Sequence, residues 1–160
     1  MKIRTGIGID VHRFEKNREF WLGGVKINHH SGLTGHSDAD ALIHAIIDAM
    51  LGAAGLKDIG TYFPDNDPGF HNIRSTKLLE EVVNIVNQNY RIGNIDAVIC
   101  LEQPKISPYI DEMKQVLSKV LMIPSEDLSI KATTFEMMGF VGKEEGVLCL
   151  ANVLLTGKHN

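Results

Sequence analysis

Three side chains in the first third of the chain could together bind a metal ion: Asp10, His12 and His44. Segment 2–12 alternates with a period of two, which predicts a half-buried strand with Asp10 and His12 on the same face. Two glycines, Gly6 and Gly8, precede them on that face and are expected to leave it open. One carboxylate and two imidazoles leave a fourth position free, which is typical of a catalytic zinc site.

His44 lies in segment 37–51, whose length and apolar content predict a helix. A histidine on an otherwise apolar helix needs a polar partner, and Asp40 and Asp48 lie one turn before and after it. A carboxylate that holds a ligating histidine fixes its ring tautomer, so we expect Asp40 and Asp48 to hold His44. The alternative is that His44 merely pairs with Asp48 in a solvated stripe. An Asp-X-His motif is a weak signal, and spacing alone supports the two interpretations about equally.

The composition indicates one ordinary globular domain over residues 1–160. The chain is 44% hydrophobic and 22% charged, with a net charge of −4 that argues against nucleic acid as a partner. No apolar stretch is long enough to cross a membrane. The strand pattern begins at Lys2, which leaves no room for a leader peptide and favours a cytoplasmic protein. Cys100 and Cys149 lie in apolar, strand-like runs and are expected to be reduced core residues.

The remaining elements follow from apolar periodicity and turn residues. A hairpin is predicted over 19–27 with its turn at Gly23-Gly24, and Ser37 is expected to cap a helix that ends near Gly55. Further helices begin near Ser75 and at Ser107-Pro108, and further strands span 95–101, 128–133 and 147–155. This order predicts an α+β fold in which a mixed β-sheet has its helices layered on one face. The other face is left bare, and self-association would cover it.

The chain resembles the 2-C-methyl-D-erythritol 2,4-cyclodiphosphate synthase family over essentially its whole length. The resemblance is carried by segments 8–12, 35–45, 58–60, 63–67 and 131–136. It implies a homotrimer that packs its sheets around a three-fold axis, with active sites between adjacent subunits. It also implies the conversion of 4-diphosphocytidyl-2-C-methyl-D-erythritol 2-phosphate to 2-C-methyl-D-erythritol 2,4-cyclodiphosphate and CMP, a step of non-mevalonate isoprenoid precursor biosynthesis.

The resemblance also implies roles for individual residues. Asp10, His12 and His44 match the ligands of one Zn²⁺ per subunit, and Glu136 matches the ligand of a second divalent cation, Mg²⁺ or Mn²⁺. His36 and Thr134 match positions that stabilise the transition state by donating to phosphate oxygens. The positions matching the substrate site are Asp10, Val11, His12, His36, Ser37, Asp58, Ile59, Gly60, Phe63, Pro64, Asp65, Asn66 and Asp67. Those matching the nucleotide site are Leu101, Glu102, Gln103, Pro104, Lys105, Ile106, Ser107, Thr133, Thr134, Phe135 and Glu136.

Two positions depart from the family pattern. Phe135 stands where a third threonine is usual, so the nucleotide loop is expected to pack differently. Phe140 and Lys143 match a central cavity that can bind isoprenoid diphosphates, and Lys143 replaces a common arginine. Lysine supplies the charge without the bidentate fork, so we expect weaker diphosphate binding there.

Two other functions compete with the cyclase. A zinc phosphohydrolase would use the same ligands to activate water, with Asp58 as the one carboxylate that could serve as its base. A non-catalytic trimer that binds isoprenoid diphosphates or metal is the third possibility. The intact ligand set and Glu136 argue against a pure binding role.

Overall fold

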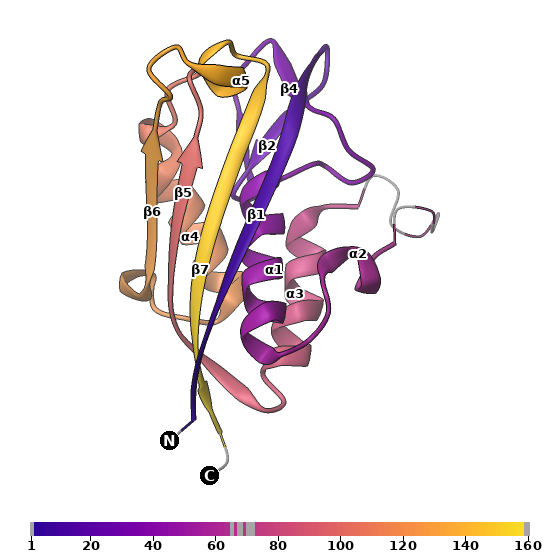
Figure 1. Ribbon diagram of the computed structural model, residues 1–160, viewed down its shortest axis with the longest axis vertical. Helices are drawn as coiled ribbons and strands as arrows, with labels where there is room; N and C mark the ends of the chain where they lie inside the picture. Colours follow the sequence, from indigo (N-terminus) through magenta and orange to yellow (C-terminus); the bar gives the residue numbers. More distant parts are fainter. Residues whose placement is uncertain (1, 65, 67–68, 70–72, 159–160) are drawn as a thin grey trace.

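The computed structural model describes residues 2–64, 66, 69 and 73–158 (Figure 1). Its strands are β1 (Ile3–Lys16), β2 (Phe20–Leu22), β3 (Val25–Ile27), β4 (Ser31–Leu33), β5 (Tyr90–Cys100), β6 (Leu128–Thr133) and β7 (Gly146–Gly157). Its α-helices are α1 (Ala41–Ala54), α2 (Ile59–Tyr62), α3 (Ser75–Val86), α4 (Ile110–Leu121) and α5 (Gly139–Gly142). Two 3₁₀ turns, Ser107–Tyr109 and Ser125–Asp127, precede α4 and β6.

A five-stranded mixed sheet forms one layer, in the order β4-β1-β7-β5-β6. The central strand β7 runs antiparallel to both β1 and β5, and β6 runs parallel to β5. Helix α1 packs on β1 and β7, α3 packs on α1, and α4 lies against β6, so the three long helices cover the same side of the sheet (Figure 1). The predicted α+β architecture is therefore confirmed.

Gly6 and Gly8 allow α1 to approach β1 closely, and they do not leave an open face as expected. A Cβ at Gly8 would lie 2.0 Å from the Ala45 carbonyl oxygen, and one at Gly6 would lie 2.1 Å from that of Ala49. These atoms belong to the backbone of α1, which cannot move aside as a flexible side chain can. The helix therefore needs both glycines to reach the strand that carries Asp10 and His12.

The start of α1 lies further along the chain than predicted. Asp40, and not Ser37, is the N-cap: its carboxylate accepts a hydrogen bond from the Ile43 N–H at 3.1 Å. The same carboxylate accepts from the N–H groups of Gly23 at 2.9 Å and Gly24 at 2.7 Å, at the turn between β2 and β3. Asp40 is fully buried, so it binds the hairpin turn to the helix start inside the core. Gly55 ends the helix as predicted, with a φ of 74°.

We expect Asp40→Ala to lower the free energy of unfolding by about 2 kcal/mol, because it removes a helix cap and leaves buried N–H groups unpaired. Urea denaturation followed by circular dichroism measures this change. The control is Glu126→Ala in an exposed turn, which is expected to leave the stability unchanged. Asp38→Ala would not serve, because the Asp38 carboxylate has contacts of its own. An Asp40→Ala protein as stable as the parent would contradict the bridging role.

Several short elements were not predicted. The three-residue strand β4 pairs with the end of β1, and α2 and α5 are four-residue helices. At Ser107-Pro108 the chain forms a 3₁₀ turn before α4 begins at Ile110. Cys100 and Cys149 are buried and unpaired, as predicted. No helix in the described part of the chain is both long and apolar enough to span a membrane.

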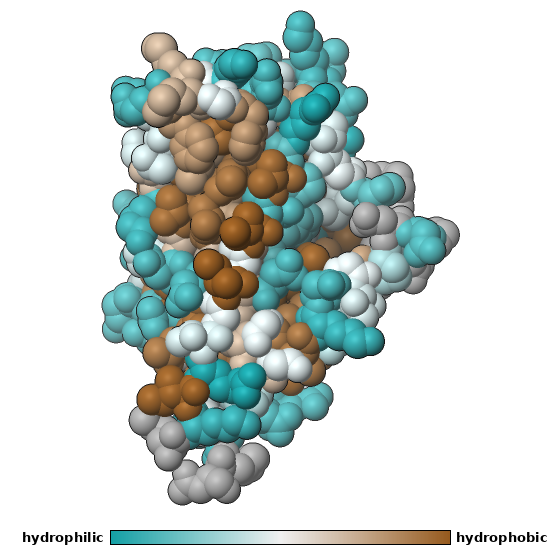
Figure 2. Space-filling view, viewed as in Figure 1, coloured by the Kyte–Doolittle hydropathy of each residue, from teal (hydrophilic) through white to brown (hydrophobic). Residues whose placement is uncertain are grey.

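The side of the sheet away from the helices carries exposed apolar side chains. Ile3, Ile7, Ile9 and Val11 of β1 are each about half exposed, at 55%, 66%, 54% and 49%. In register beside them, β7 places Leu148 opposite Val11 and Leu150 opposite Ile9. Figure 2 shows hydrophobic side chains gathered over β1 and β7 on this side. We call this surface the apolar sheet face; it is the bare face that the sequence predicted.

Candidate metal centre

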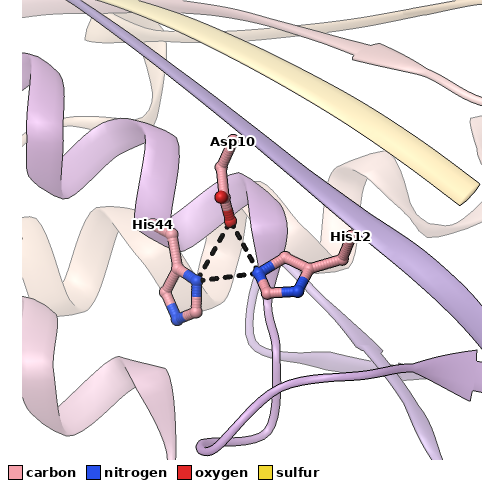
Figure 3. Close-up of side chains that lie close together, drawn as sticks. All are labelled: Asp10, His12 and His44. Atoms are coloured by element: carbon pink, nitrogen blue, oxygen red, sulfur yellow. Dashed lines mark hydrogen bonds and ion pairs between the residues drawn. The ribbon is translucent and has the colours of Figure 1, made fainter. Parts of the chain in front are cut away.

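Asp10, His12 and His44 converge between β1 and α1 (Figure 3). Asp10 and His12 extend from the side of β1 that faces the helix, and His44 extends from the first turn of α1. The Asp10 Oδ2 atom lies 2.8 Å from His12 Nε2 and 3.1 Å from His44 Nδ1. The two ring nitrogens lie 3.3 Å from each other. The predicted triad is thus assembled from the predicted elements.

The spacing of the three atoms fits a tetrahedral metal ion. Zinc binds imidazole nitrogen and carboxylate oxygen at about 2.0–2.1 Å, which places neighbouring tetrahedral ligands about 3.3 Å apart. Of the three observed separations, the one between the two ring nitrogens, 3.3 Å, equals that value. The two that involve Asp10, 3.1 and 2.8 Å, are a few tenths of an ångström shorter. Three ligands on one side leave the fourth position for another group.

Each histidine ring is oriented by a second hydrogen bond. His12 Nδ1 lies 2.6 Å from the Thr34 carbonyl oxygen, which can only accept, so this nitrogen carries the proton and Nε2 faces the centre. His44 Nε2 lies 2.9 Å from Ser75 Oγ and 3.3 Å from Ser37 Oγ. The nitrogens aimed at Asp10 are therefore His12 Nε2 and His44 Nδ1.

The prediction that Asp40 and Asp48 hold the His44 ring is wrong. Asp40 is occupied by the backbone N–H groups at the hairpin turn and the helix start. Asp48 accepts from the Ile59 N–H at 2.8 Å and so connects α1 to α2. Helical spacing placed both carboxylates near His44, but they accept hydrogen bonds from backbone N–H groups instead. The alternative of a solvated His44–Asp48 pair is excluded by the same contacts.

Charge and burial act against each other on these groups. Burial alone would raise the pKa of Asp10, but hydrogen bonds and charge from His12 and His44 hold it well below its ordinary value. Burial would lower the pKa of His12, yet the hydrogen bond and charge of Asp10 raise it. Asp10 is therefore ready to bind a cation across the physiological pH range. Protons compete for His12, so metal binding should weaken as the pH falls through the raised pKa of His12.

The triad opens into a cavity of about 210 Å³. Gly35, His36 and Ser37 contribute to its wall, together with the apolar residues Ile59, Phe63, Ile73 and Leu78. Four of the predicted substrate residues outside the triad, His36, Ser37, Ile59 and Phe63, thus line the same cavity as the triad. Ile73 and Leu78 were missed, because an apolar residue in a loop or a helix stripe gives no sequence signal for a ligand cavity.

The other predicted substrate residues have different surroundings. Asp58 caps α2 and accepts from the Thr61 N–H at 2.9 Å, and Gly60 lies in that helix. Val11 points its side chain to the apolar sheet face, so it could contact a ligand only through its backbone. Pro64 and Asn66 follow α2, while Asp65 and Asp67 lie outside the described residues.

The predicted nucleotide residues form a separate cluster where β5 and β6 end. The Leu101 N–H donates to the Thr133 carbonyl oxygen at 3.0 Å, and the Phe135 N–H donates to Glu102 Oε2 at 3.1 Å. The Gln103-Pro104 bond is cis, and Thr134 Oγ1 donates to Glu136 Oε1 at 3.0 Å. The whole cluster comprises Leu101, Glu102, Gln103, Pro104, Lys105, Ile106, Ser107, Thr133, Thr134, Phe135 and Glu136.

This cluster is not part of the metal cavity of the same chain. No residue of 101–107 or 133–136 is among the described residues that line the cavity, and Glu136 is exposed. Phe140 and Lys143 lie beyond it, in and directly after α5; Phe140 is half-buried and Lys143 is exposed. One chain therefore presents the predicted site as two separate halves.

Known proteins match this chain over nearly its whole length. The 2-C-methyl-D-erythritol 2,4-cyclodiphosphate synthase of Bacteroides fragilis is 53% identical over 156 residues, which cover 97% of this chain and 98% of the relative. The synthase of Porphyromonas gingivalis strain W83 is 52% identical over 153 residues, covering 95% and 94%.

Solved structures show the same fold. An IspF–CDP complex from Plasmodium falciparum matches with a TM-score of 0.86 and 37% identity, covering 98% of this chain and 97% of that one. Bifunctional IspDF from Campylobacter jejuni matches with a TM-score of 0.92 and 40% identity over 96% of this chain, which spans 42% of that longer protein. The model of the YgbB family matches residues 3–156, and the chain belongs to this family of 2-C-methyl-D-erythritol 2,4-cyclodiphosphate synthases.

Proposed function

We propose that this chain is a metal-dependent cyclase whose active site is built by two copies of the chain. Its family makes it a 2-C-methyl-D-erythritol 2,4-cyclodiphosphate synthase, which converts 4-diphosphocytidyl-2-C-methyl-D-erythritol 2-phosphate to the cyclic diphosphate and CMP. The observation that carries the metal dependence is the convergence of Asp10, His12 and His44 in the lining of a cavity.

Asp10, His12 and His44 would hold the ion, and two imidazoles with one carboxylate favour zinc over magnesium. When bound, the ion supplies a Lewis acid and a template for phosphate oxygens. His36 and Ser37 line the same cavity and can donate hydrogen bonds to those oxygens. Ile59 and Phe63 supply apolar surface that excludes water beside the methylerythritol carbons.

The reaction asks the protein mainly to position two phosphates. An oxygen of the 2-phosphate attacks the β-phosphorus, and the bond from that phosphorus to the oxygen bridging the α- and β-phosphates breaks, which releases CMP. Such in-line transfer gains most from fixed geometry and from neutralised charge. A cavity lined by both hydrogen-bond donors and apolar side chains meets both needs.

The second copy would supply the nucleotide half of the site. Thr134 would donate to a phosphate oxygen, and Glu136 would hold a second divalent cation, Mg²⁺ or Mn²⁺. Segments 101–107 and 133–136 would bind the cytidine. The separation of this cluster from the metal cavity in one chain supports the proposal, and so does the apolar sheet face, which a homotrimer would bury around its three-fold axis. Phe140 and Lys143 as an isoprenoid diphosphate site, and a cytoplasmic location, stay predictions.

We expect Ile9→Asp to separate the copies, because an unpaired carboxylate on the apolar sheet face would be costly to bury. Ile9 is 54% exposed in the single chain. Analytical ultracentrifugation should then find the parent protein as a trimer and the variant as a monomer. Met122→Asp is the matched control, since Met122 is 64% exposed at the end of α4 and should leave the trimer intact. A monomeric parent would contradict the proposed assembly.

A subunit-mixing experiment tests the shared site. His44→Ala disables the metal half and Glu136→Gln disables the other half, so each variant alone should release little CMP. The two variants are unfolded, mixed in equal amounts and refolded with metal. The mixture should regain about a quarter of the parent activity, because one subunit junction in four then pairs an intact metal half with an intact nucleotide half. Each variant refolded alone is the control. If both halves act within one chain, the mixture will stay inactive.

The hydrolase alternative finds less support. Asp58, its one available base, accepts hydrogen bonds from the Thr61 N–H and Oγ1 at 2.9 and 3.0 Å and does not line the metal cavity. Its carboxylate is therefore engaged in capping α2. A binding role without catalysis would not need the donors that surround the triad.

A further inference from the structure

We propose that Ser75 and Asp38 position the metal ligand His44 through a chain of hydrogen bonds that begins at its far ring nitrogen. This inference rests on the metal site proposed above and concerns residues outside that site's predicted ligands. His44 Nε2 lies 2.9 Å from Ser75 Oγ, and Ser75 is fully buried at the start of α3. Ser75 Oγ in turn contacts Asp38 Oδ1, and the Ser75 N–H lies 3.1 Å from Asp38 Oδ2.

The direction of each hydrogen bond in this chain is determined. An ionised carboxylate only accepts, so the single hydroxyl proton of Ser75 goes to Asp38. The lone pairs of Ser75 Oγ then face His44, whose Nε2 must carry the proton. In the neutral ring His44 Nδ1 then carries no proton, and it is this nitrogen that lies 3.1 Å from Asp10 Oδ2 at the metal centre. The chain therefore selects the tautomer that can bind a metal.

Asp38 is itself held firmly. Its side chain is only 6% exposed and pairs with the Arg74 guanidinium, with Arg74 Nε 3.0 Å from Asp38 Oδ2. The guanidinium carbon of Arg74 lies 3.3 Å from the centre of the Trp21 ring in β2, a cation–π contact. The Asp38 N–H also donates to the Ile73 carbonyl oxygen at 3.1 Å. The carboxylate thus has a fixed position relative to α3 and the hairpin.

Ser37 makes a weaker contact with the same nitrogen and provides a comparison. Its Oγ lies 3.3 Å from His44 Nε2 and already accepts from the Ala39 N–H at 3.1 Å. No carboxylate among the described residues accepts its proton. Ser37 can therefore donate as easily as accept and does not select a tautomer. Groups that orient a metal-bound histidine are typically worth 10–100-fold in metal affinity.

The test is zinc affinity, measured with Zn²⁺ alone against a competing chelator, in the full-length protein. We expect Ser75→Ala and Asp38→Asn each to weaken Zn²⁺ binding by about 10–100-fold. Ser37→Ala should weaken it less. Co²⁺ substitution gives a second readout, because a freely rotating His44 ring should change the d–d absorption bands. Thermal melting of each variant in chelator shows whether the fold is retained.

A double-mutant cycle separates positioning from a structural effect. If Ser75 and Asp38 act through one chain, the Ser75→Ala/Asp38→Asn protein should lose about as much affinity as the worse single variant. Additive losses, or Ser75→Ala with parental affinity and an unchanged Co²⁺ spectrum, would overturn the inference. A parent protein that binds neither ion would instead refute the proposed metal site, so the two failures are distinguishable.

Discussion

Replacing His44 by alanine should slow CMP release by about a thousandfold while leaving the fold intact. The triad would lose one of its three ligands, and Asp10 and His12 alone cannot define a tetrahedral site. A metal ion that stabilises transition-state charge contributes several kcal/mol, and about 4 kcal/mol corresponds to a thousandfold in rate. Steady-state assays with added Zn²⁺ and Mg²⁺ measure the loss.

The matched control for this substitution is His30→Ala. His30 is exposed just before β4, and its ring packs against that of His29 at 4.1 Å between centroids. The same chemical change there should leave the rate unaltered. If metal-stripped His44→Ala protein keeps its activity, the metal assignment fails.

The largest loss of stability is expected for Gly8→Ala, at about 3 kcal/mol or more. The added Cβ would lie 2.0 Å from the Ala45 carbonyl oxygen and 2.7 Å from the Ala49 N atom, so β1 and α1 must move apart. Because Asp10 and His12 lie on β1 and His44 lies on α1, this movement should also reduce metal affinity. Urea denaturation and Zn²⁺ titration measure the two effects separately.

Gly52→Ala provides the opposite expectation in the same helix. Nothing lies within 4 Å of a Cβ at Gly52, which is exposed in α1. Alanine is the better helix former, so this variant should gain up to about 1 kcal/mol. If Gly8→Ala is as stable as Gly52→Ala, the close approach of α1 to β1 is not what fixes the site.

The metal triad was predictable because ligand identity and local periodicity are both visible in the sequence. Alternation in 2–12 fixes which side of β1 carries Asp10 and His12, and the helix pattern places His44 in α1. The role of Gly6 and Gly8 was predicted wrongly, for a physical reason. A glycine that leaves a face open and one that admits a helix look identical until the partner element is known.

The hydrogen-bond partners of the site could not be predicted in the same way. Ser75 lies 31 residues from His44, and their contact depends on how α3 packs against α1. Helical spacing favoured Asp40 and Asp48, but it does not include the backbone donors of the hairpin turn and of α2 that bind them. β4 has only three residues, too few for a pattern.

Phosphorus NMR of 4-diphosphocytidyl-2-C-methyl-D-erythritol 2-phosphate incubated with the purified protein tests metal-dependent cyclisation most directly. With Zn²⁺ and Mg²⁺ present, we expect the signals of CMP and of a cyclic diphosphate to appear together. After chelation both should be absent, and both should return when the metals are restored. Release of inorganic phosphate would favour a hydrolase, and cyclic product formed at the full rate in chelator would contradict the metal centre.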